Sequence, residues 1–585
     1  MQRVRFSWYL LVASVIALFA LSQRTSWAAS AGLPISTPEP VRLSTSQRLS
    51  QLLATKGSEQ SRDISVPQMS RPMTTLPLAV SPLPFHQYMP FIKTLAPAFD
   101  PAGFANCRYG TSDLSTKQNL WLPTFGVGWD LNFGSQPYRT TEGIEFARVI
   151  RVQQNKNGCE YLDGFTVSPA LTEGSLGAMV DAAPGALWIV GNEPDRGPGP
   201  PDPNDPQCEN RVQDDTYPQW YAQGYHDVYY FIKQRDPAAQ VAVAGLVEVT
   251  PGRLQYLDIM WQTYVEKYHE PMPVDVWNMH LYILPEARPD GSNNGVATMA
   301  LGTDPALAIR ESGDDPAQCA NPMVYCWAEQ DDLSIFAEQV VAMRTWMKNH
   351  GQQNKPLVLS EYSILFPVWF MDEYGNYFTP ERIANFMTDA FAYLESASDP
   401  NLGYPRDNNK LIQQHLWFSV NVPLRAAGSS SNLVVDEITS LTPLGRLFKS
   451  EIAQRPRNIN LLPDPIALVI GFTAPGTGGA TVNLAVDVRN NGNIEATFPF
   501  TVRFYADSAL LQPIGSAVIN EAISGCARRV RTATVAWGGL QPGIHRFWVK
   551  VDATGSIAEE NEGDNVTSGL VMIDPIRAFL PQISR

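Results

Sequence analysis

Between about Cys107 and Gln454 short apolar runs alternate with amphipathic stretches, and this alternation limits the possible folds more than any other feature. Runs of apolar and β-branched residues are typical of strands covered on both faces, and the stretches between them repeat apolar residues at helical spacing. The eight runs read CRYGTS, VGWDLNFG, FARVIRVQ, LWIVGNEP, VAVAGLVEV, VDVWNMHLY, PLVLSEYSI and QQHLWFSV. Strands that alternate with helices predict βα units around a parallel sheet. We therefore expect an α/β fold, a closed (β/α)8 TIM barrel over residues 102–455, whose first two crossovers are poorly helical.

A different periodicity begins after RPRNINLLPDP, which is typical of a linker. Apolar residues alternate with polar ones over residues 482–488, 500–504 and 547–551. A period of two predicts antiparallel strands that bury one face. We therefore expect an all-β, immunoglobulin-like sandwich over residues 462–574, followed by a short tail over residues 575–585.

The first 28 residues have the features of a signal peptide. A basic start precedes the apolar residues 10–21, and Ser-Trp-Ala at residues 26–28 offers a cleavage site. An uncleaved membrane anchor is the alternative, because aromatic residues before the apolar stretch could lengthen it. Residues 29–101 are rich in Pro, Ser and Thr and lack sustained periodicity, so we expect a disordered spacer. The protein is therefore expected to be secreted, either free or at the cell surface.

Composition disfavours several classes of partner. The net charge is -15 and no basic run is present, which argues against nucleic acid or an anionic membrane as partner beyond the export signal. No CxxC motif or His/Cys cluster occurs, so we expect neither a metal site nor a cofactor. The six cysteines fit an oxidising compartment. The pairs that spacing allows are Cys319–Cys326 and Cys107–Cys159, with Cys208 and Cys526 left unpaired.

Two glutamates close apolar runs of the predicted barrel. Glu193 ends the fourth run in WIVGNEPD, and Glu361 ends the seventh in LVLSEYS. Reactive groups in a βα barrel lie at the carboxyl ends of the strands, so closure of the barrel would bring both glutamates to one mouth. One protonated and one ionised carboxyl group facing each other suit the cleavage of a glycosidic bond. The alternative is that each glutamate is a surface residue in a salt bridge.

Around these residues the chain resembles clan A of the glycoside hydrolases, retaining barrel enzymes with Asn-Glu at the end of strand four and a second Glu at the end of strand seven. The resemblance covers about 350 residues and is carried by GNEPD, HLY and LSEY. It implies that Glu193 is the acid/base and that Glu361 is the nucleophile. It also implies that Asn192 hydrogen-bonds the sugar hydroxyl beside the reacting carbon.

The same resemblance gives roles to three further side chains. His280 and Tyr282 close the sixth run on one side of the strand, where the tyrosine hydroxyl would hold the nucleophile ionised. Trp417 would form the floor beneath the sugar, because sugar rings offer C–H faces that stack on aromatic rings. The alternatives are a buried aromatic pair and an ordinary core tryptophan. The arginine that many clan members carry near the nucleophile is absent from VGWDLNFG, and the candidate substitutes are Arg148 and Arg151.

The C-terminal part resembles the bacterial cell-adhesion-related domain, CARDB, an immunoglobulin-like module, over about 110 residues. Its acidic loop, IAEENEGDNV, suits calcium, which prefers carboxylate oxygens, although an acidic turn is most often only solvated. Together the resemblances imply a secreted retaining glycoside hydrolase that acts on a polysaccharide or oligosaccharide, with a sandwich that contacts a cell surface or the polysaccharide. The alternative is a non-catalytic glycan-binding or adhesion protein with a glycosidase-like barrel.

Overall fold

A computed structural model describes residues 105–197 and 213–575, with the exception of residues 425, 475, 477 and 498. The predicted signal peptide, the predicted spacer and nearly all of the predicted C-terminal tail lie outside the described residues. The described residues belong to one compact unit. None of the helices among them is both long enough and apolar enough to cross a membrane.

Each of the eight apolar runs contains a strand, as predicted. The strands are β1 (Asn106–Ser112), β2 (Val127–Leu131), β3 (Glu145–Phe146) with β4 (Arg148–Asn157), β6 (Leu187–Val190), β7 (Gln240–Val243), β8 (Trp277–His280), β11 (Leu357–Tyr362) and β12 (Gln414–Trp417). One sheet has the order β3-β2-β1-β12-β11-β8, and a second has the order β5-β4-β6-β7. All pairings are parallel except that of β4 with β5. Every residue of β6, β8, β11 and β12 is buried, which explains the uninterrupted apolar runs.

Backbone contacts join the edges of the two sheets. A parallel bridge links Ala242 of β7 to Val276, directly before β8. At the other edge the amide of Val149 in β4 donates to the carbonyl of Gly134, in the segment after β2, at 2.9 Å. Both sheets contribute to one buried cluster, made of Trp129, Leu131, Ala147, Val149, Leu187, Ile189, Ala242, Val276, Val358 and Leu416.

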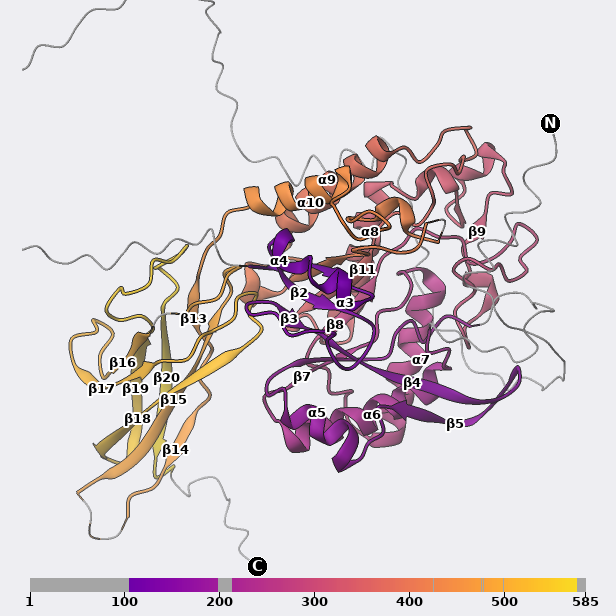
Figure 1. Cartoon of the computed structure of the whole chain (residues 1–585). Helices are drawn as coiled ribbons and strands as arrows, with labels where there is room; N and C mark the ends of the chain where they lie inside the picture. Colours follow the sequence, from indigo (N-terminus) through magenta and orange to yellow (C-terminus); the bar gives the residue numbers. More distant parts are fainter. Residues whose placement is uncertain are drawn as a thin grey trace, which may run out of the picture. The chain divides into compact units, whose positions relative to one another are not determined.

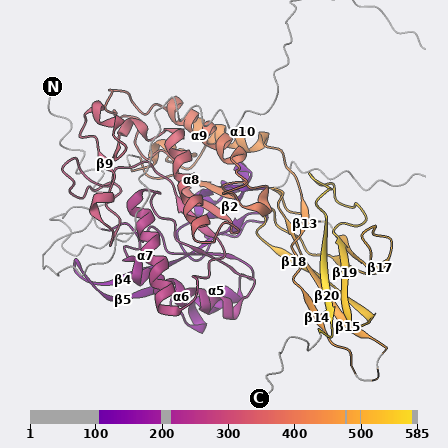
Figure 2. The ribbon, with the colours of Figure 1, turned by 180° about the vertical axis from the view of Figure 1, so that it is seen from behind.

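Long helices follow the later strands, where the amphipathic stretches predicted them. They are α6 (Pro218–Arg235), α7 (Pro251–Tyr268), α8 (Leu333–Asn349), α9 (Pro380–Ser396) and α10 (Pro443–Gln454). Four of them begin at a proline, which suits the first helical position because its missing N–H would have no intrahelical partner. In both views α8 to α10 lie on one side of the strands and α5 (Ala178–Asp181), α6 and α7 on the other (Figures 1 and 2).

The early crossovers and the remaining short elements are less regular. Between β1 and β2 lie only α3 (Thr116–Asn119) and α4 (Leu122–Phe125), as expected. After β4 the chain turns back as β5 (Glu160–Ser168), an antiparallel hairpin that the sequence analysis missed. Short elements elsewhere are η3 (Glu173–Gly177), η4 (Pro305–Leu307), β9 (Arg310–Glu311), η5 (Pro316–Ala320), β10 (Val324–Tyr325), η6 (Trp327–Glu329), η7 (Pro405–Asp407) and η8 (Ser429–Ser431).

The C-terminal strands form two sheets. One contains β13 (Leu461–Pro463), β15 (Ala480–Asn490) and β18 (Val530–Leu540). The other has the order β14 (Val469–Gly471), β20 (Val566–Ile573), β19 (Gly543–Lys550), β16 (Phe500–Tyr505) and β17 (Pro513–Ile519). Along the first part of β15 buried and exposed residues alternate, so the predicted period of two is confirmed there.

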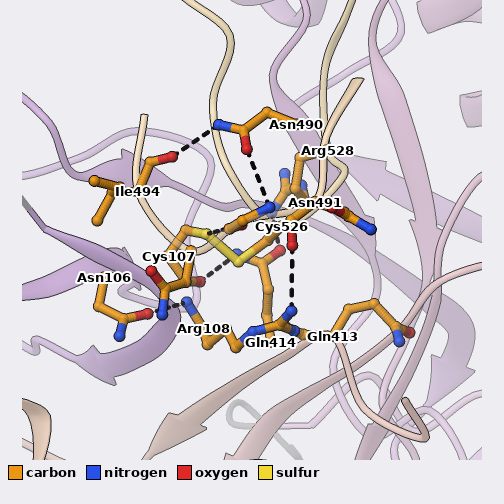
Figure 3. Close-up of a disulfide and its surroundings, with 12 residues drawn as sticks. Asn106, Cys107, Arg108, Gln413, Gln414, Asn490, Asn491, Ile494, Cys526 and Arg528 are labelled. Carbon is orange, nitrogen blue, oxygen red and sulfur yellow. Dashed lines mark hydrogen bonds between the residues drawn. A yellow bond between two sulfur atoms is a disulfide. The ribbon is translucent and has the colours of Figure 1, made fainter. Parts of the chain in front are cut away.

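The disulfides correct one predicted pairing. Cys319 and Cys326 are bonded as predicted. Cys107, however, is bonded to Cys526 rather than to Cys159, so Cys526 is not free (Figure 3). Cys107 lies at the amino end of β1, whereas Cys159 lies beyond the carboxyl end of the ten-residue β4, and the ends of such long parallel strands are too far apart for a bridge. Cys159 is itself disulfide-bonded.

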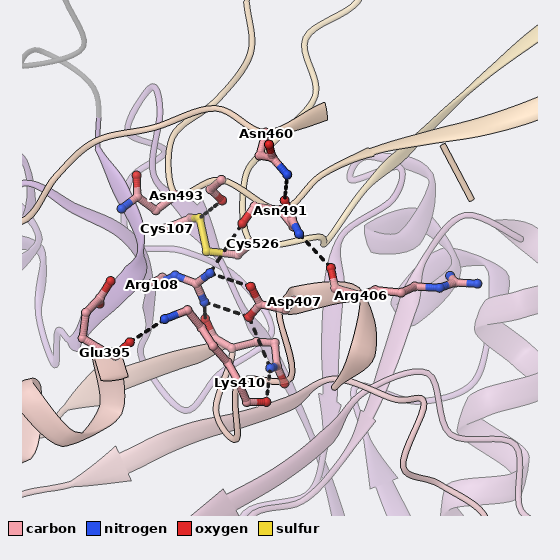
Figure 4. Close-up of polar contacts among 12 residues, drawn as sticks. Cys107, Arg108, Glu395, Arg406, Asp407, Lys410, Asn460, Asn491, Asn493 and Cys526 are labelled. Atoms are coloured by element: carbon pink, nitrogen blue, oxygen red, sulfur yellow. Dashed lines mark hydrogen bonds and ion pairs between the residues drawn. A yellow bond between two sulfur atoms is a disulfide. The ribbon is translucent and has the colours of Figure 1, made fainter. Parts of the chain in front are cut away.

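Two arginines connect the parallel strands to the C-terminal sheets. Arg108 of β1 forms a buried ion pair with Asp407, with contacts of 2.6 and 2.9 Å, and also donates to the carbonyl of Asn491 in the turn after β15 (Figure 4). Arg528, just before β18, donates to the first residues of three parallel strands, Gln240, Gln414 and Glu145 (Figure 3 shows the Gln414 end). The amino ends of these strands are therefore covered by the C-terminal part.

Candidate active site

The segment after β6 holds Glu193 in an unusual backbone conformation. Gly191 has φ 98°, and a Cβ there would lie 2.9 Å from Asp214 Oδ2, so only glycine fits. The Asn192 amide donates to the same carboxylate at 2.9 Å. Glu193 follows at φ 44°, with its amide donating to the carbonyl of Gly245 at 3.1 Å. A left-handed non-glycine residue costs free energy and persists only where its surroundings enforce it, so the position of Glu193 is imposed.

Four of the predicted site residues lie together. His280, the last residue of β8, places Nδ1 3.0 Å from Glu193 Oε1 and 3.6 Å from Glu361 Oε2. The Tyr282 hydroxyl donates to Glu361 Oε1 at 2.8 Å. Gly245 permits this arrangement, because a Cβ there would lie 2.2 Å from the imidazole of His280. All four side chains are buried, and Glu361 is the most exposed of them at 8%.

The two carboxyl groups are close enough to act on one bond. One oxygen of Glu193, one oxygen of Glu361 and a ring nitrogen of His280 all lie within 4.8 Å of one another. The imidazole of His280 contacts both carboxyl groups. The arrangement can therefore hold one proton that either glutamate can carry.

Burial and charge separate the pKa values of the two glutamates. For Glu193 burial acts to raise the pKa, but the hydrogen bond and charge of His280 and the charge of Arg196 outweigh it, and the pKa is lowered. For Glu361 burial dominates, the charge of Glu193 adds to it, and the pKa rises to about 7 in spite of His280, Tyr282 and Arg196. Burial lowers the pKa of His280, yet the two carboxylates raise it overall. These surroundings therefore favour a proton on Glu361 over one on Glu193.

Arg196 is the cation that the sequence analysis did not find. Its Nη1 lies 3.9 Å from Glu193 Oε2, and its Nη2 donates to the carbonyl of Val296 at 2.6 Å. Neither candidate substitute does this. Arg148 donates to the carbonyl of Ser135, and Arg151 pairs with Asp214. The signal was present in the sequence, because Arg196 stands three residues after Glu193.

Trp417 is not brought to the carboxyl pair. It is fully buried, its indole N–H donates to the carbonyl of Ser431 at 3.0 Å, and its ring contacts Tyr362 and Phe391. Its neighbour Leu416 belongs to the cluster shared by the two sheets, so alternation turns Trp417 toward the helices. Phe418, the next residue on the same face of the strand as Leu416, is only half-buried. The centroid of its ring lies 6.1 Å from that of Phe133. Among the residues of β12 and directly after it, Phe418 rather than Trp417 is thus the aromatic side chain that approaches the inner cluster, through Phe133.

Two groups of described residues have the spacing of metal ligands. Glu193, His280 and Glu361 have a spacing that could hold a divalent ion. The group of Cys319, Cys326 and Glu373 has the spacing too, but both of its sulfurs are in a disulfide and supply no thiolate.

Carboxylates of the acidic loop in the C-terminal part accept hydrogen bonds from residues 458–461. Glu559 accepts the Leu461 amide, Glu560 accepts the Asn458 amide group, and Asp564 accepts from Asn460 at 2.9 Å. These carboxylates brace the loop against the segment that enters the domain. The other carboxylate oxygen of Asp564, Oδ1, is buried without a hydrogen-bond partner among the described residues.

Comparison with solved structures gives remote similarities. One is a GH128 (subgroup III) curdlan-specific exo-β-1,3-glucanase from Blastomyces gilchristii in complex with glucose, with 12% identity, a TM-score of 0.34, and coverage of 59% of this chain and 97% of that chain. Another is a glucosidase from Croceicoccus marinus, with 11% identity, a TM-score of 0.33, and coverage of 75% and 98%. No curated protein is significantly similar to the chain.

The C-terminal part has matches of its own. The CARDB domain of a Pyrococcus furiosus protein, in complex with di-metal ions, is 19% identical with a TM-score of 0.16, and the match covers 20% of this chain and 97% of that chain. Residues 469–569 match the family model described as CARDB, inside the segment 462–574 where the resemblance was expected. The family-model match therefore describes the strands of the C-terminal part, and it does not extend over the parallel strands that hold the carboxyl pair.

Proposed function

We propose that the protein is a retaining glycoside hydrolase in which Glu193 is the acid/base and Glu361 the nucleophile. The observation that carries this proposal is the buried carboxyl pair, with oxygens within 4.8 Å of each other. Retaining enzymes hold their two carboxyl groups about 5–5.5 Å apart, whereas inverting enzymes need about 6.5–9.5 Å to admit a water molecule. The spacing supports double displacement.

The strand order supports a closed (β/α)8 barrel. The parallel bridge between Ala242 and Val276 and the hydrogen bond from Val149 to Gly134 join the two sheets at both edges. Glu193 then follows the fourth strand and Glu361 ends the seventh, both at the carboxyl ends, where barrel enzymes place their chemistry. Closure of one barrel accounts for two glutamates 168 residues apart sharing one site (361 − 193 = 168).

In the first step ionised Glu361 attacks the anomeric carbon and protonated Glu193 gives its proton to the leaving oxygen. The Tyr282 hydroxyl orients the attacking carboxylate through its 2.8 Å hydrogen bond. In the second step Glu193, now ionised, takes a proton from water, and that water releases the sugar from Glu361 with retained configuration.

The proton must change sides before the first step. In the free protein Glu361 is the favoured carrier, because burial raises its pKa, while His280, which lies closer to Glu193, helps to lower the pKa of that carboxyl group. The reactive form is the other arrangement of the same single proton, with Glu193 protonated. His280 contacts both carboxyl groups, at 3.0 and 3.6 Å, so a small shift of its ring toward Glu361 would favour this form.

The substrate class is a polysaccharide or oligosaccharide, and the surroundings supply further contacts for it. We propose Asn192 as the group that hydrogen-bonds the hydroxyl beside the reacting carbon, and Phe418 as the aromatic face under the sugar in place of Trp417. An exported protein suits this role, and the CARDB domain is a candidate for contacts with the cell surface or the polysaccharide. No cofactor or metal enters the proposed steps.

Two variants test the assignment. Glu361→Ala should lose several orders of magnitude in turnover on every substrate, because no glycosyl-enzyme can form. Glu193→Ala should still react with a dinitrophenyl glycoside, whose leaving group needs no proton, and then stall for lack of a base. Azide needs no base, so it should restore turnover and give a glycosyl azide of retained configuration.

The matched control is Glu451→Ala on α10, which removes a glutamate outside the site and should leave turnover within twofold. If both site variants keep the activity of the parent, the catalytic assignment is wrong. If the parent binds glycans without cleaving any glycoside on a broad panel, the non-catalytic alternative holds instead.

A further inference from the structure

A second buried charge cluster lies beside the carboxyl pair and plays no part in the proposed steps. Arg253, in the first turn of α7, is fully buried together with Asp195, Glu248 and Glu286. Its Nη1 contacts Asp195 at 2.5 Å, and its Nε lies 3.2 Å from Glu286 and 3.8 Å from Glu248. One guanidinium thus faces three carboxyl groups without solvent.

This cluster ties together the segments that follow three successive strands. Asp195 comes after β6, Glu248 after β7 and Glu286 after β8. The other guanidinium nitrogen of Arg253 donates to the carbonyls of residues 297 and 298 at 2.9 and 3.0 Å. The same segments carry the acid/base after β6 and the imidazole at the end of β8. Arg253 is therefore the common contact of the loops that hold the reacting groups.

Asp195 is the part of the cluster nearest to Glu193. It lies two residues further along the chain, its Oδ2 accepts the Val247 amide at 3.4 Å, and its carbonyl accepts the Leu301 amide at 2.9 Å. These contacts fix the chain just beyond the strained φ of Glu193. Asp195 Oδ1 is buried and has no hydrogen-bond partner among the described residues.

The charges of the cluster do not cancel. Burial raises the pKa of Asp195, of Glu286 and, most of all, of Glu248, since a single guanidinium cannot neutralise three carboxylates. Glu248 Oε1 is also buried without a hydrogen-bond partner among the described residues. A network that is only partly satisfied is costly for stability, so its presence beside a reacting group points to a role in the reaction.

We infer that Asp195 and Arg253 are positioning residues that set the place of the Glu193 carboxyl group for proton transfer. This inference rests on the proposed function and deepens it. Neither residue touches the reacting atoms; each acts through Glu193. A displacement of about 1 Å in a catalytic group can cost about a hundredfold in rate, so loosening the segment should weaken proton donation specifically.

The test measures how the rate depends on the leaving group. In Asp195→Asn, which keeps the shape of the side chain, kcat/KM on a glycoside with an unactivated alcohol leaving group should fall about 10- to 100-fold. Glycosylation by the dinitrophenyl glycoside of the same sugar needs no proton from Glu193 and should fall less than about threefold. Azide should raise the steady-state turnover of the dinitrophenyl glycoside by Asp195→Asn. Arg253→Lys, which keeps a cation, should show the same pattern.

Two comparisons separate positioning from a loss of stability. Asp407→Asn breaks another buried ion pair, that with Arg108, and should change the rates on both substrates alike, if it changes either. In the Glu193→Ala background Asp195→Asn should add less than about twofold to the leaving-group effect, because residues that act as a unit are not additive. Equal losses on both substrates, full additivity, or an unchanged Asp195→Asn enzyme would overturn the inference. If Glu193→Ala itself shows no leaving-group effect, it is the proposed function that fails.

Discussion

The buried charged groups at the two ends of the parallel strands differ in how completely they are paired. At the amino ends, Arg108 meets Asp407 through two hydrogen bonds, and Arg528 has a partner for each nitrogen of its guanidinium at the start of three strands (Figures 3 and 4). At the carboxyl ends, Arg253 faces three carboxyl groups, and Glu193 and Glu361 share one imidazole.

This difference indicates that the charges at the amino ends stabilise the fold, whereas those at the carboxyl ends serve the reaction. Buried arginines with several hydrogen-bond partners hold elements together, as the disulfide between Cys107 and Cys526 does at the same end. Charges that are crowded and incompletely paired have shifted pKa values, and these concentrate where reactions occur. The amino ends are therefore the place to look for changes in unfolding, and the carboxyl ends the place to look for changes in rate.

Removal of residues 462–585 should have the largest effect on unfolding. It takes away Cys526, Arg528 and the carbonyl of Asn491, and so leaves Arg108 and the starts of three strands uncovered. A disulfide alone contributes about 2–5 kcal/mol, so we expect the melting temperature to fall by about 10 °C or more. Thermal unfolding followed by circular dichroism checks this. A truncated protein that melts within about 2 °C of the parent would show that the amino ends need no cover.

Arg528→Met should have a smaller effect of the same kind. It keeps the apolar stem but leaves Glu145, Gln240 and Gln414 without their donor, at a cost of about 2–4 kcal/mol in the free energy of unfolding. Turnover of an aryl glycoside at 25 °C should stay within about twofold of the parent.

The matched control is Arg531→Met on β18, whose partner Glu521 is exposed, and here about 1 kcal/mol or less should be lost. Urea denaturation measures both variants. Equal losses in the two would contradict the view that Arg528 holds the strand ends.

Tyr282→Phe should instead change the rate and its pH dependence. The reactive pair carries one proton, so kcat/KM should be highest between a limb below the ordinary glutamate value of 4.5, from Glu193, and a limb near pH 7, from Glu361. The Tyr282 hydroxyl stabilises ionised Glu361 beside His280, so its removal raises that pKa. The limb near pH 7 should move to higher pH while kcat falls about tenfold. If the limb near pH 7 does not move, Tyr282 does not influence the pKa of the nucleophile.

Chelation should have the smallest effect. The spacing of Glu193, His280 and Glu361 could hold a divalent ion, but proton transfer between the same groups needs none. Dialysis against EDTA should leave kcat/KM unchanged within error. Activity that is lost on dialysis and restored by one metal would make the three residues a metal centre.

Much of the architecture could be predicted, because strands buried on both faces read as apolar runs, as in Leu187–Val190. The carboxyl pair was predictable for the same reason, since each glutamate closes such a run. Trp417 was expected beneath the sugar, but residues of a strand point alternately to its two faces. Leu416 belongs to the inner cluster, so the next residue on that face is Phe418.

Contacts between distant segments left no local signal. Cys107 and Cys526 are 419 residues apart, and no spacing rule connects them. Asp195 and Arg253 read as ordinary charged residues of a loop and a helix, and only the fold makes them one buried cluster. Physical chemistry of this kind depends on the neighbours in space, which the order of residues does not reveal.

The most direct test of the account is to find where the sugar becomes attached. Glu193→Ala should be mixed with the dinitrophenyl glycoside of a sugar that the parent cleaves, quenched within the first turnover, digested and examined by mass spectrometry. We predict that the peptide containing Leu357–Tyr362 gains the mass of one glycosyl group, attached to Glu361. Release of dinitrophenol without any adduct, or an adduct on another residue, would contradict the assignment of the nucleophile.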